Sequence, residues 1–255
     1  MIQSIDRAIR VLTALQGARR MSLSDLAARL ELAPSTTHGI VRSLVEHGMV
    51  VQERGSNRYQ LGPAVLRLGN VYLDTLELRS KSIPWAEDLA RRTGCAVRTG
   101  VLLVDDVVII HHEPRPDGSR QMPEVGIVIP GHASALGKAM LAFLPDEAGR
   151  VLGSPLRSMT GETVTDAALL RAQLDDVRRS GIAVEQDEAV LGESGLASPV
   201  FDSWGGAVGA IGIVVPSGQM PAGQAGEHDA RDVVRETARA VSRELGAASW
   251  PPPLA

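Results

Sequence analysis

The sequence contains one cysteine, Cys95, a small share of aromatic residues, and no long uninterrupted apolar run. A single cysteine excludes a disulfide within the chain and fits a reducing compartment. No stretch approaches the ~20 apolar residues of a membrane-spanning helix, and the N-terminus lacks a signal-peptide pattern. We therefore expect a cytoplasmic protein that does not contact a membrane, and its 255 residues are enough for two domains with separate cores.

The chain as a whole also lacks the basic charge that is typical of nucleic-acid binders, because its formal net charge is −4. The charges are unevenly distributed, however. The first 62 residues carry eight arginines against five acidic residues, whereas the remainder carries 18 basic against 25 acidic residues. Only the N-terminal segment therefore has the charge sign that DNA requires.

The segment 22–48 has the pattern of a helix-turn-helix. A first helix is expected from about Ser24 to Leu30, with Ser22 or Ser24 as its N-cap. Residues 31–33 then form the turn that leads into a second helix. Helix-turn-helix patterns also occur by chance, so an ordinary three-helix core remains the alternative interpretation.

Pro34 suits the start of this second helix, which Ser35 or Thr36 can cap and Gly48 can end. Four apolar residues recur at helical spacing and are expected to pack inward: Ile40, Val41, Leu44 and Val45. Small hydroxyls and one arginine stay on the outer, N-terminal side, which suits contacts to phosphates and base edges. The predicted DNA-contacting residues of this helix are Ser35, Thr36, Thr37, His38 and Arg42.

A β-hairpin is expected directly after the second helix, over residues 49–61. A short apolar run is followed by a polar segment with turn residues and then by an alternating segment that begins at Tyr59. A hairpin in this position is typical of a wing, whose arginines contact the DNA backbone or the minor groove. The predicted DNA-contacting residues of the wing are Arg54, Ser56, Asn57 and Arg58.

We predict a winged helix-turn-helix domain over residues 1–62, a linker helix over 63–82, a second domain over 83–248 and a tail over 249–255. A helix from Ser4 to about Gly17 opens the first domain, and its expected inner side is Ile5, Ala8, Ile9, Leu12 and Leu15. The linker helix carries an apolar stripe, for which a second copy of the chain is one candidate partner. Pro84 is expected to break or restart this helix before a further helical stretch, 85–93.

Strands and helices mix without strict alternation in the second domain, which indicates an α+β sheet sandwiched by helices. Strands are expected at 96–104, 107–113, 126–130, 182–186, 196–201 and 207–215, and helices at 135–144, 166–180 and 227–245. The run Gly131–Ala139 predicts a helix start with Ser134 as its cap. Free amides near Ala135 and Leu136 would make an anion site there, with Ala135 and Gly137 small enough for a ligand to approach. A plain N-cap with small residues for close packing is the alternative.

The winged segment, the linker helix, HASALGKAMLAFLP, GIAVEQDE and GLASPVFD together resemble the IclR family of bacterial transcriptional regulators. The resemblance covers about residues 2–245 and implies a winged helix-turn-helix, a GAF-like effector-binding domain, and dimers or tetramers on double-stranded operator DNA. The family's signature residues fall where expected at Gly181, Glu188, Ala197, Val200, Phe201 and Asp202.

The resemblance also implies an effector pocket, formed by Ser134, Ala135, Leu136, Glu185, Gly195, Gly212 and Val214. Two of these positions depart from the family's pattern, since Glu185 replaces the usual Asp or Ser and Gly195 replaces Cys, Ser or Ala. Gly212 and Val214 are often Ser in relatives that bind small oxo-acids. A roomier and less polar wall is therefore expected here, which argues against a simple oxo-acid effector.

A narrower similarity joins three further stretches, LRLGNVYLDTLELRSKSIPW, RPDGSRQMPEVG and RAVSRELGA, to the glycerol operon regulators of actinomycetes. It implies control of glycerol catabolism, with glycerol or a glycerol phosphate as the effector and no cofactor. A phosphate would suit the amides near Ala135 and the nearby Lys138. Control of aromatic-compound degradation is an alternative within the same family.

The sequence offers less support for two other classes of function, enzymes and metal sensors. The chain has no nucleophile elbow, phosphate loop or paired acids at diagnostic spacing, so we do not expect an enzyme. A metal sensor would use Cys95, His111 or His112, and His132, but adjacent histidines on a strand face opposite sides. The expected protein is a ligand-controlled repressor or activator, a homodimer or homotetramer whose effector shifts the spacing of two recognition helices.

Overall fold

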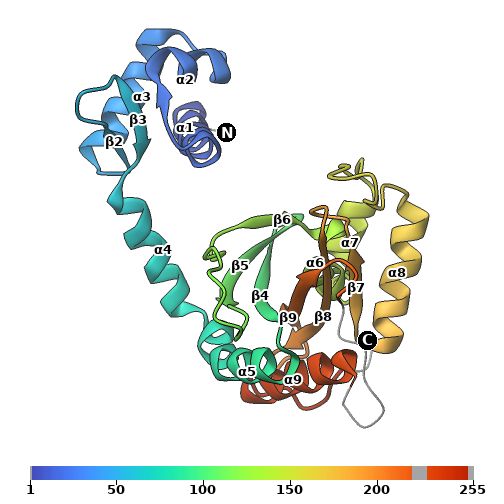
Figure 1. Cartoon of the computed structure of the whole chain (residues 1–255). Helices are drawn as coiled ribbons and strands as arrows, with labels where there is room; N and C mark the ends of the chain where they lie inside the picture. The colour runs from blue at the N-terminus through green and yellow to red at the C-terminus, as the bar shows by residue number, and fades with distance from the viewer. Residues whose placement is uncertain (1, 220–228, 252–255) are drawn as a thin grey trace. The chain divides into compact units, whose positions relative to one another are not determined.

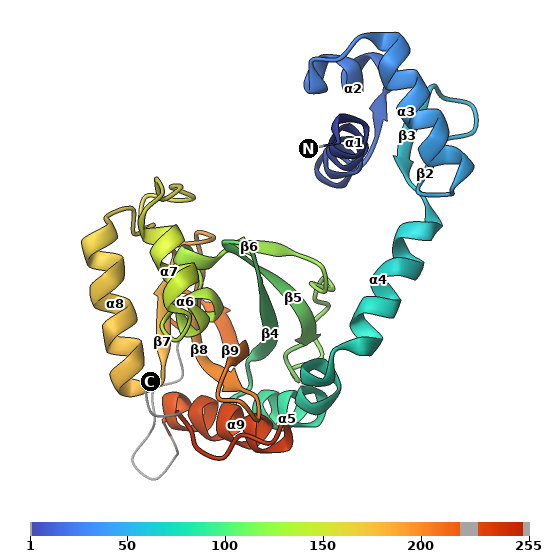
Figure 2. The same cartoon turned by 180° about the vertical axis from the view of Figure 1, so that it is seen from behind.

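The structure is a computed structural model that describes residues 2–219 and 229–251. The chain divides into two compact units, Met1–Thr75 and Leu76–Ala255 (Figures 1 and 2). No helix in these described ranges is long and apolar enough to cross a membrane. The predicted start of the last helix at Glu227 and the last four residues of the predicted tail lie outside the described residues.

The first unit is a three-helix domain with a small sheet and one further helix. It contains α1 (Gln3–Ala18), α2 (Leu23–Leu30), α3 (Pro34–Glu46), α4 (Pro63–Thr75), β1 (Met21–Ser22), β2 (Val50–Gln52) and β3 (Arg58–Leu61). Strand β3 lies between β1 and β2 and pairs antiparallel with both. The helix-turn-helix and the hairpin are confirmed, and β1 is an addition, because a two-residue strand leaves no periodic pattern to detect.

The starts of α2 and α3 differ in how they are capped. Ser22 caps α2 in a capping box, in which the Asp25 amide donates to Ser22 Oγ at 3.1 Å and the Ser22 amide donates to Asp25 Oδ2 at 3.2 Å. The N-cap of α3 is Ala33, whose side chain caps nothing, so the prediction that Ser35 or Thr36 caps this helix is wrong. Pro34 takes the first helical position and places both residues inside the helix.

Two predictions about helices in the first unit and the linker are wrong. Helix α1 buries Val11, Ala14 and Leu15, whereas Ile5 and Ile9 are 55% and 57% exposed. The linker helix ends at Thr75, and a second helix, α5 (Glu77–Thr93), runs through Pro84 without a break. Burial on both sides of the proline, at Leu78, Ala86, Leu89 and Ala90, outweighs the ~3 kcal/mol cost of a proline inside a helix.

The second unit is built on a six-stranded antiparallel sheet in the order β6-β5-β4-β9-β8-β7. The strands are β4 (Ala96–Leu103), β5 (Asp106–Glu113), β6 (Val128–Pro130), β7 (Ala183–Gln186), β8 (Glu193–Phe201) and β9 (Ala207–Pro216). The predicted α+β class is therefore confirmed. Strand β8 begins three residues before the predicted start, because Glu193 to Gly195 still pair with β9.

Helices pack on both sides of this sheet (Figures 1 and 2). Helices α5 and α9 (Ala230–Glu244) contact each other and the strands β4, β8 and β9. Helix α6 (Ala135–Leu141) packs against β7, β8 and β9 and is followed by α7 (Pro145–Leu152) and α8 (Ala167–Ser180). The main core lies between α6, α8 and the sheet and includes Leu136, Met140, Leu170, Leu174 and Ala197.

Candidate functional site

The N-terminal part of α3 presents a polar surface to solvent. Ser35, His38 and Arg42 are exposed and Thr36 is half-buried. Arg42 Nε donates to Glu46 Oε1 at 3.1 Å, one turn further along the helix. An exposed pair of this kind contributes only ~0.3–0.5 kcal/mol, so a DNA phosphate can compete for the guanidinium.

Thr37 does not belong to this surface. Its side chain is 0% exposed, and Thr37 Oγ1 donates to the Ala33 carbonyl at 3.2 Å. The prediction that Thr37 faces outward is therefore wrong. Thr37, Val41 and Leu44 lie at i, i+4 and i+7, so the helical spacing already indicated that Thr37 lies on the buried side of α3.

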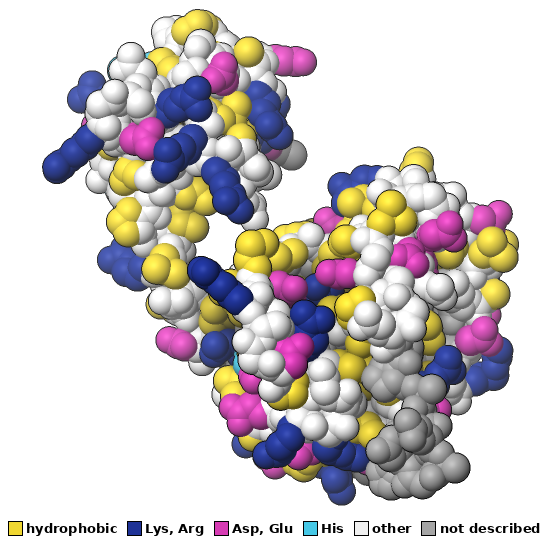
Figure 3. Space-filling view, viewed as in Figure 1, with side chains coloured by type: hydrophobic (Ala, Val, Ile, Leu, Met, Phe, Trp, Pro, Cys, Tyr) yellow, Lys and Arg dark blue, Asp and Glu magenta, His cyan; other side chains and the backbone are white. Residues whose placement is uncertain are grey.

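The tip of the hairpin between β2 and β3 is basic and exposed. Arg54, Asn57 and Arg58 are exposed, and Figure 3 shows arginines over the surface of the first unit. Ser56 is half-buried, and its Oγ donates to Glu53 Oε2 at 2.7 Å. Arg20 Nη1 lies 2.7 Å from Glu53 Oε1, so Glu53 ties the hairpin to the segment before β1. Sequence reasoning missed this role of Arg20.

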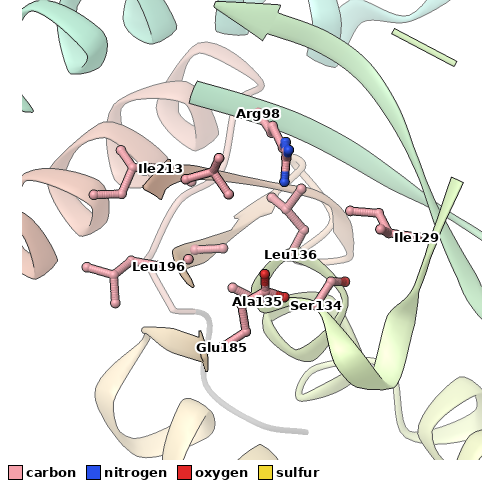
Figure 4. A pocket seen from close by; sticks show the side chains of 12 residues that line it. Arg98, Ile129, Ser134, Ala135, Leu136, Glu185, Leu196 and Ile213 are labelled. Carbon is pink, nitrogen blue, oxygen red and sulfur yellow. The ribbon is translucent and has the colours of Figure 1, made fainter. Parts of the chain in front are cut away.

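The second unit contains a cavity between the sheet and the start of α6 (Figure 4). Strand register places Glu185, Gly195 and Val214 in one cross-strand row and Gly212 opposite Arg98 in the next. All seven residues of the predicted effector pocket line this one cavity: Ser134, Ala135, Leu136, Glu185, Gly195, Gly212 and Val214. The structure brings the predicted set together and adds Arg98, Ile129, Leu196, Ala197 and Ile213.

The cavity is small. The space open to the centre of a water molecule is about 20 Å³, and all the space between its atoms, the open mouth included, is about 260 Å³. The volume of about 20 Å³ is enough for about one or two ordered water molecules. A ligand of several heavy atoms therefore has to move side chains at the mouth, and the smaller the ligand, the less has to move.

Glu185 occupies the polar end of the cavity. Its side chain comes from β7 and is 5% exposed, and its Oε2 accepts a hydrogen bond from the Ala135 amide at 3.0 Å. Burial raises the pKa of this carboxyl to about 7, although the Ala135 hydrogen bond and the nearby Lys138 and Arg98 oppose the shift. The expectation of a free amide at Ala135 is therefore wrong, because the chain's own carboxylate already accepts from it.

Lys138 and Glu188 form a buried ion pair beside the cavity. Lys138 Nζ lies 2.5 Å from Glu188 Oε1, and the two side chains are 1% and 7% exposed. Burial lowers the pKa of Lys138, and the negative charge of Glu188 opposes that shift. The expectation that Lys138 is available to a phosphate is therefore wrong, because its ammonium group is already paired and shielded.

Arg98 is the charged residue of the cavity that sequence reasoning missed. Its guanidinium Nη2 donates to Glu124 Oε1 at 2.9 Å, and its Nη1 donates to Glu193 Oε2 at 3.2 Å. The side chain is only 12% exposed. A lone arginine in the apolar strand 96–103 was a usable signal, but its partners lie 26 and 95 residues away along the chain.

Three glycines around the cavity have different roles. A Cβ on Gly137 would lie 2.1 Å from the Gly131 carbonyl oxygen, so this position is small to allow backbone packing, as the alternative interpretation held. A Cβ on Gly212 would lie 2.1 Å from the Leu196 carbonyl oxygen, so its missing side chain leaves no space in the cavity. The expectation of a roomier wall at Gly212 is therefore wrong.

At Gly195 the missing side chain makes room for a neighbour. A Cβ there would lie 3.3 Å from Glu185 Cγ, and Gly195 is the cross-strand partner of Glu185. A side chain at 195 would therefore require Glu185 to shift by a few tenths of an ångström. The sizes of the residues at 185 and 195 are thus linked through this contact.

In the part of the chain that the structure describes, Cys95 and the histidines considered for a metal sensor do not form a metal site. Cys95 is buried, and the ring Nε2 of His132 lies 3.0 Å from the Arg157 carbonyl oxygen, at hydrogen-bond distance. Within residues 2–219 and 229–251, no three His, Cys, Asp or Glu side chains converge closely enough to hold a metal ion. The metal-sensor alternative therefore gains no support from the geometry.

Comparison with known proteins identifies the family. The family model for the IclR helix-turn-helix domain matches residues 4–54, and the model for the C-terminal part of the bacterial transcriptional regulator IclR matches residues 70–243. The chain belongs to the IclR family of bacterial transcriptional regulators. Its members are DNA-binding regulators controlled by small molecules, not enzymes.

Individual relatives agree with this assignment. The chain is 46% identical to the glycerol operon regulatory protein of Streptomyces griseus, over 96% of this chain and 97% of the relative. The protein of the same name from Streptomyces coelicolor is 41% identical over the same shares. Among solved structures, an IclR transcriptional regulator from Silicibacter sp. TM1040 matches with a TM-score of 0.83 and 27% identity, over 98% of each chain.

Proposed function

We propose that this IclR-family regulator controls a catabolic operon, that of glycerol utilisation, in response to a small molecule of that pathway. The observation that carries the proposal is the 46% identity to a glycerol operon regulatory protein along nearly the whole of both chains. Glycerol and a glycerol phosphate are both candidate effectors, and the cavity beside α6 is the proposed place where the effector binds.

The proposed DNA-binding surface is the exposed side of α3 together with the tip of the wing. It comprises Ser35, Thr36, His38 and Arg42 on α3, with Arg54, Asn57 and Arg58 on the wing. A helix N-terminus that carries small hydroxyls can enter the major groove, while exposed arginines neutralise phosphates on either side. Ser56 contributes less directly, because its hydroxyl is bound to Glu53.

Two copies of the chain are proposed to pair through the first unit. Helix α4 has no buried residue, and Leu66, Leu68, Val71 and Tyr72 are each at least half exposed. Ile5 and Ile9 on α1, with Ile2 just before this helix, form a second set of exposed apolar residues. Apolar stripes of this size on a monomer mark interaction surfaces, and a two-fold dimer would present two recognition helices to a palindromic operator.

The experiment that tests the function is a gel-shift with the DNA upstream of the chain's own gene and of neighbouring genes. A specific complex that glycerol or glycerol 3-phosphate weakens or strengthens supports the proposal. Neighbouring genes for a glycerol facilitator and a glycerol kinase would agree with it, whereas a cluster for aromatic degradation would contradict the glycerol assignment. Sedimentation of wild-type protein and of Leu68→Asp tests the pairing, because the variant should shift toward monomer.

A further inference from the structure

Above pH 7, where Glu185 is ionised, the cavity carries a negative charge of its own at the place where an anionic ligand would bind. Glu185 Oε2 accepts the Ala135 amide at 3.0 Å, and its side chain is 5% exposed. A phosphate or carboxylate that sought the same amide would first have to displace this carboxylate. It would then leave a buried acid without its hydrogen-bond donor, which is costly.

The cations near the cavity are already neutralised by acids. Arg98 is held by Glu124 and Glu193, and Lys138 is held by Glu188 at 2.5 Å. Arg98 and Lys138 therefore each have a carboxylate partner, and Glu185 is an additional acid beside them. An anion entering the cavity meets no uncompensated positive charge, and it is repelled most strongly where water is excluded.

The same arrangement suits a ligand that donates hydrogen bonds. Glu185 Oε1 accepts no hydrogen bond from the described part of the chain, whereas Oε2 is occupied. A carboxylate oxygen is a strong acceptor for hydroxyl donors. Ile129, Leu136 and Val214 supply apolar walls for a short carbon chain, and the limited space favours a ligand of few carbons.

We propose that the cavity binds an uncharged three-carbon polyol, one hydroxyl of which donates to Glu185, and that Glu185 excludes phosphorylated molecules of similar size. This rests on the proposed function, since it names the chemical class of the effector of that same site. Of the two candidate effectors, it selects glycerol against glycerol phosphate.

The test is equilibrium dialysis of the full chain, without DNA, against radiolabelled glycerol and radiolabelled glycerol 3-phosphate at pH 8, where most of Glu185 is ionised. The wild-type protein should bind glycerol at least tenfold more tightly than glycerol 3-phosphate. Glu185→Gln keeps the shape of the side chain and an acceptor for the Ala135 amide but removes the charge. It should lower the preference for glycerol by about tenfold, a change of ~1.4 kcal/mol.

Glu162→Gln is the matched control, because Glu162 is an exposed carboxylate outside the cavity and its change removes the same charge. It should leave the preference unchanged. The proposal is overturned if the wild type prefers glycerol 3-phosphate, if it binds neither compound, or if folded Glu185→Gln keeps the wild-type preference. A gel-shift on the same preparation distinguishes failure of this proposal from failure of the proposed function. If the protein binds the operator but not glycerol, only the proposed class of ligand is contradicted. If it binds glycerol but not the operator, only the proposed function is contradicted.

Discussion

The charged side chains of the α3 surface are exposed to solvent, whereas those near the cavity beside α6 are buried in ion pairs. Arg42 on α3 is exposed and pairs with Glu46, which is also exposed, so its charge is available to a partner. Lys138 and Arg98 near the cavity are shielded and held by carboxylates. An exposed pair exchanges partners at little cost, whereas a buried pair resists exchange, because each charge has lost its water. This difference fits a surface that meets a polyanion and a cavity that meets a neutral molecule.

The largest expected effect comes from breaking the buried pair. Lys138→Ala leaves Glu188 buried without its partner, and the free energy of unfolding should fall by about 3–5 kcal/mol. Arg42→Ala, which breaks the exposed pair, should cost about 0.5 kcal/mol or less. Urea unfolding of both variants measures the contrast. Equal losses of stability in the two variants would show that the buried and the exposed ion pair contribute equally to folding.

A second prediction concerns the pH dependence of stability. The pKa of Glu185 in the folded chain is about 7, above its usual value of 4.5, so folding takes up a proton between these pH values. That stabilisation is fully present below pH 4.5 and is lost as the pH rises through 7. Lys138 and Arg98 limit the shift, while Glu188 adds to it.

Glu185→Gln removes this titration. Between pH 4.5 and 8, the free energy of unfolding of the wild type should fall relative to that of the variant by about 3 kcal/mol, at 1.36 kcal/mol per pKa unit. Urea unfolding at several pH values measures it, with Glu162→Gln as the exposed control that should follow the wild type. Parallel profiles for wild type and Glu185→Gln would mean that Glu185 is ionised as readily as a surface acid.

DNA binding should respond to the exposed arginine. Arg42→Ala should weaken operator binding by about 1–3 kcal/mol, which corresponds to about five- to 150-fold, while the fold stays intact. Arg91→Ala is the matched control, since Arg91 is an exposed arginine of the second unit paired with Asp88 on its own helix. Fluorescence anisotropy with labelled operator gives both affinities. Unchanged affinity in Arg42→Ala would remove this residue from the interface.

The smallest expected effect separates two adjacent threonines. Thr36→Ala should weaken operator binding or alter its specificity, because Thr36 is part of the proposed surface. Thr37→Val removes a hydroxyl that donates to Ala33 inside the core, so it should lower stability by about 1 kcal/mol and leave operator affinity unchanged. The reverse pattern in anisotropy measurements would show that α3 faces DNA with its other side.

The sequence predicted most of what depends on local pattern. The helical spacing of apolar residues and the alternation after residue 94 were enough for the winged domain and the α+β sheet. Ile5 and Ile9 were assigned to the core because periodicity identifies an apolar side without showing what covers it. Pro84 was expected to break a helix because local rules omit the burial of the residues on both sides.

Seven of the residues that line the cavity were predicted, but their hydrogen bonds and ion pairs were not. The prediction of these seven residues rested on the family resemblance, and the strand register explains why residues from different strands line the same cavity. The pairing of Arg98 with Glu124 and Glu193 could not be predicted, because it joins three segments far apart in the chain. The hydrogen bond from Ala135 to Glu185 likewise could not be predicted, and it occupies one of the two amides that were expected to bind an anion.

We expect the cavity to control DNA binding through its effector and to contribute nothing to operator affinity when no effector is bound. The decisive measurement is the operator affinity of Glu185→Gln by fluorescence anisotropy, with and without glycerol. The expected result is wild-type affinity without glycerol and a weakened or absent response to glycerol. Loss of operator affinity in the absence of glycerol would contradict the claim and make Glu185 a structural residue of the fold.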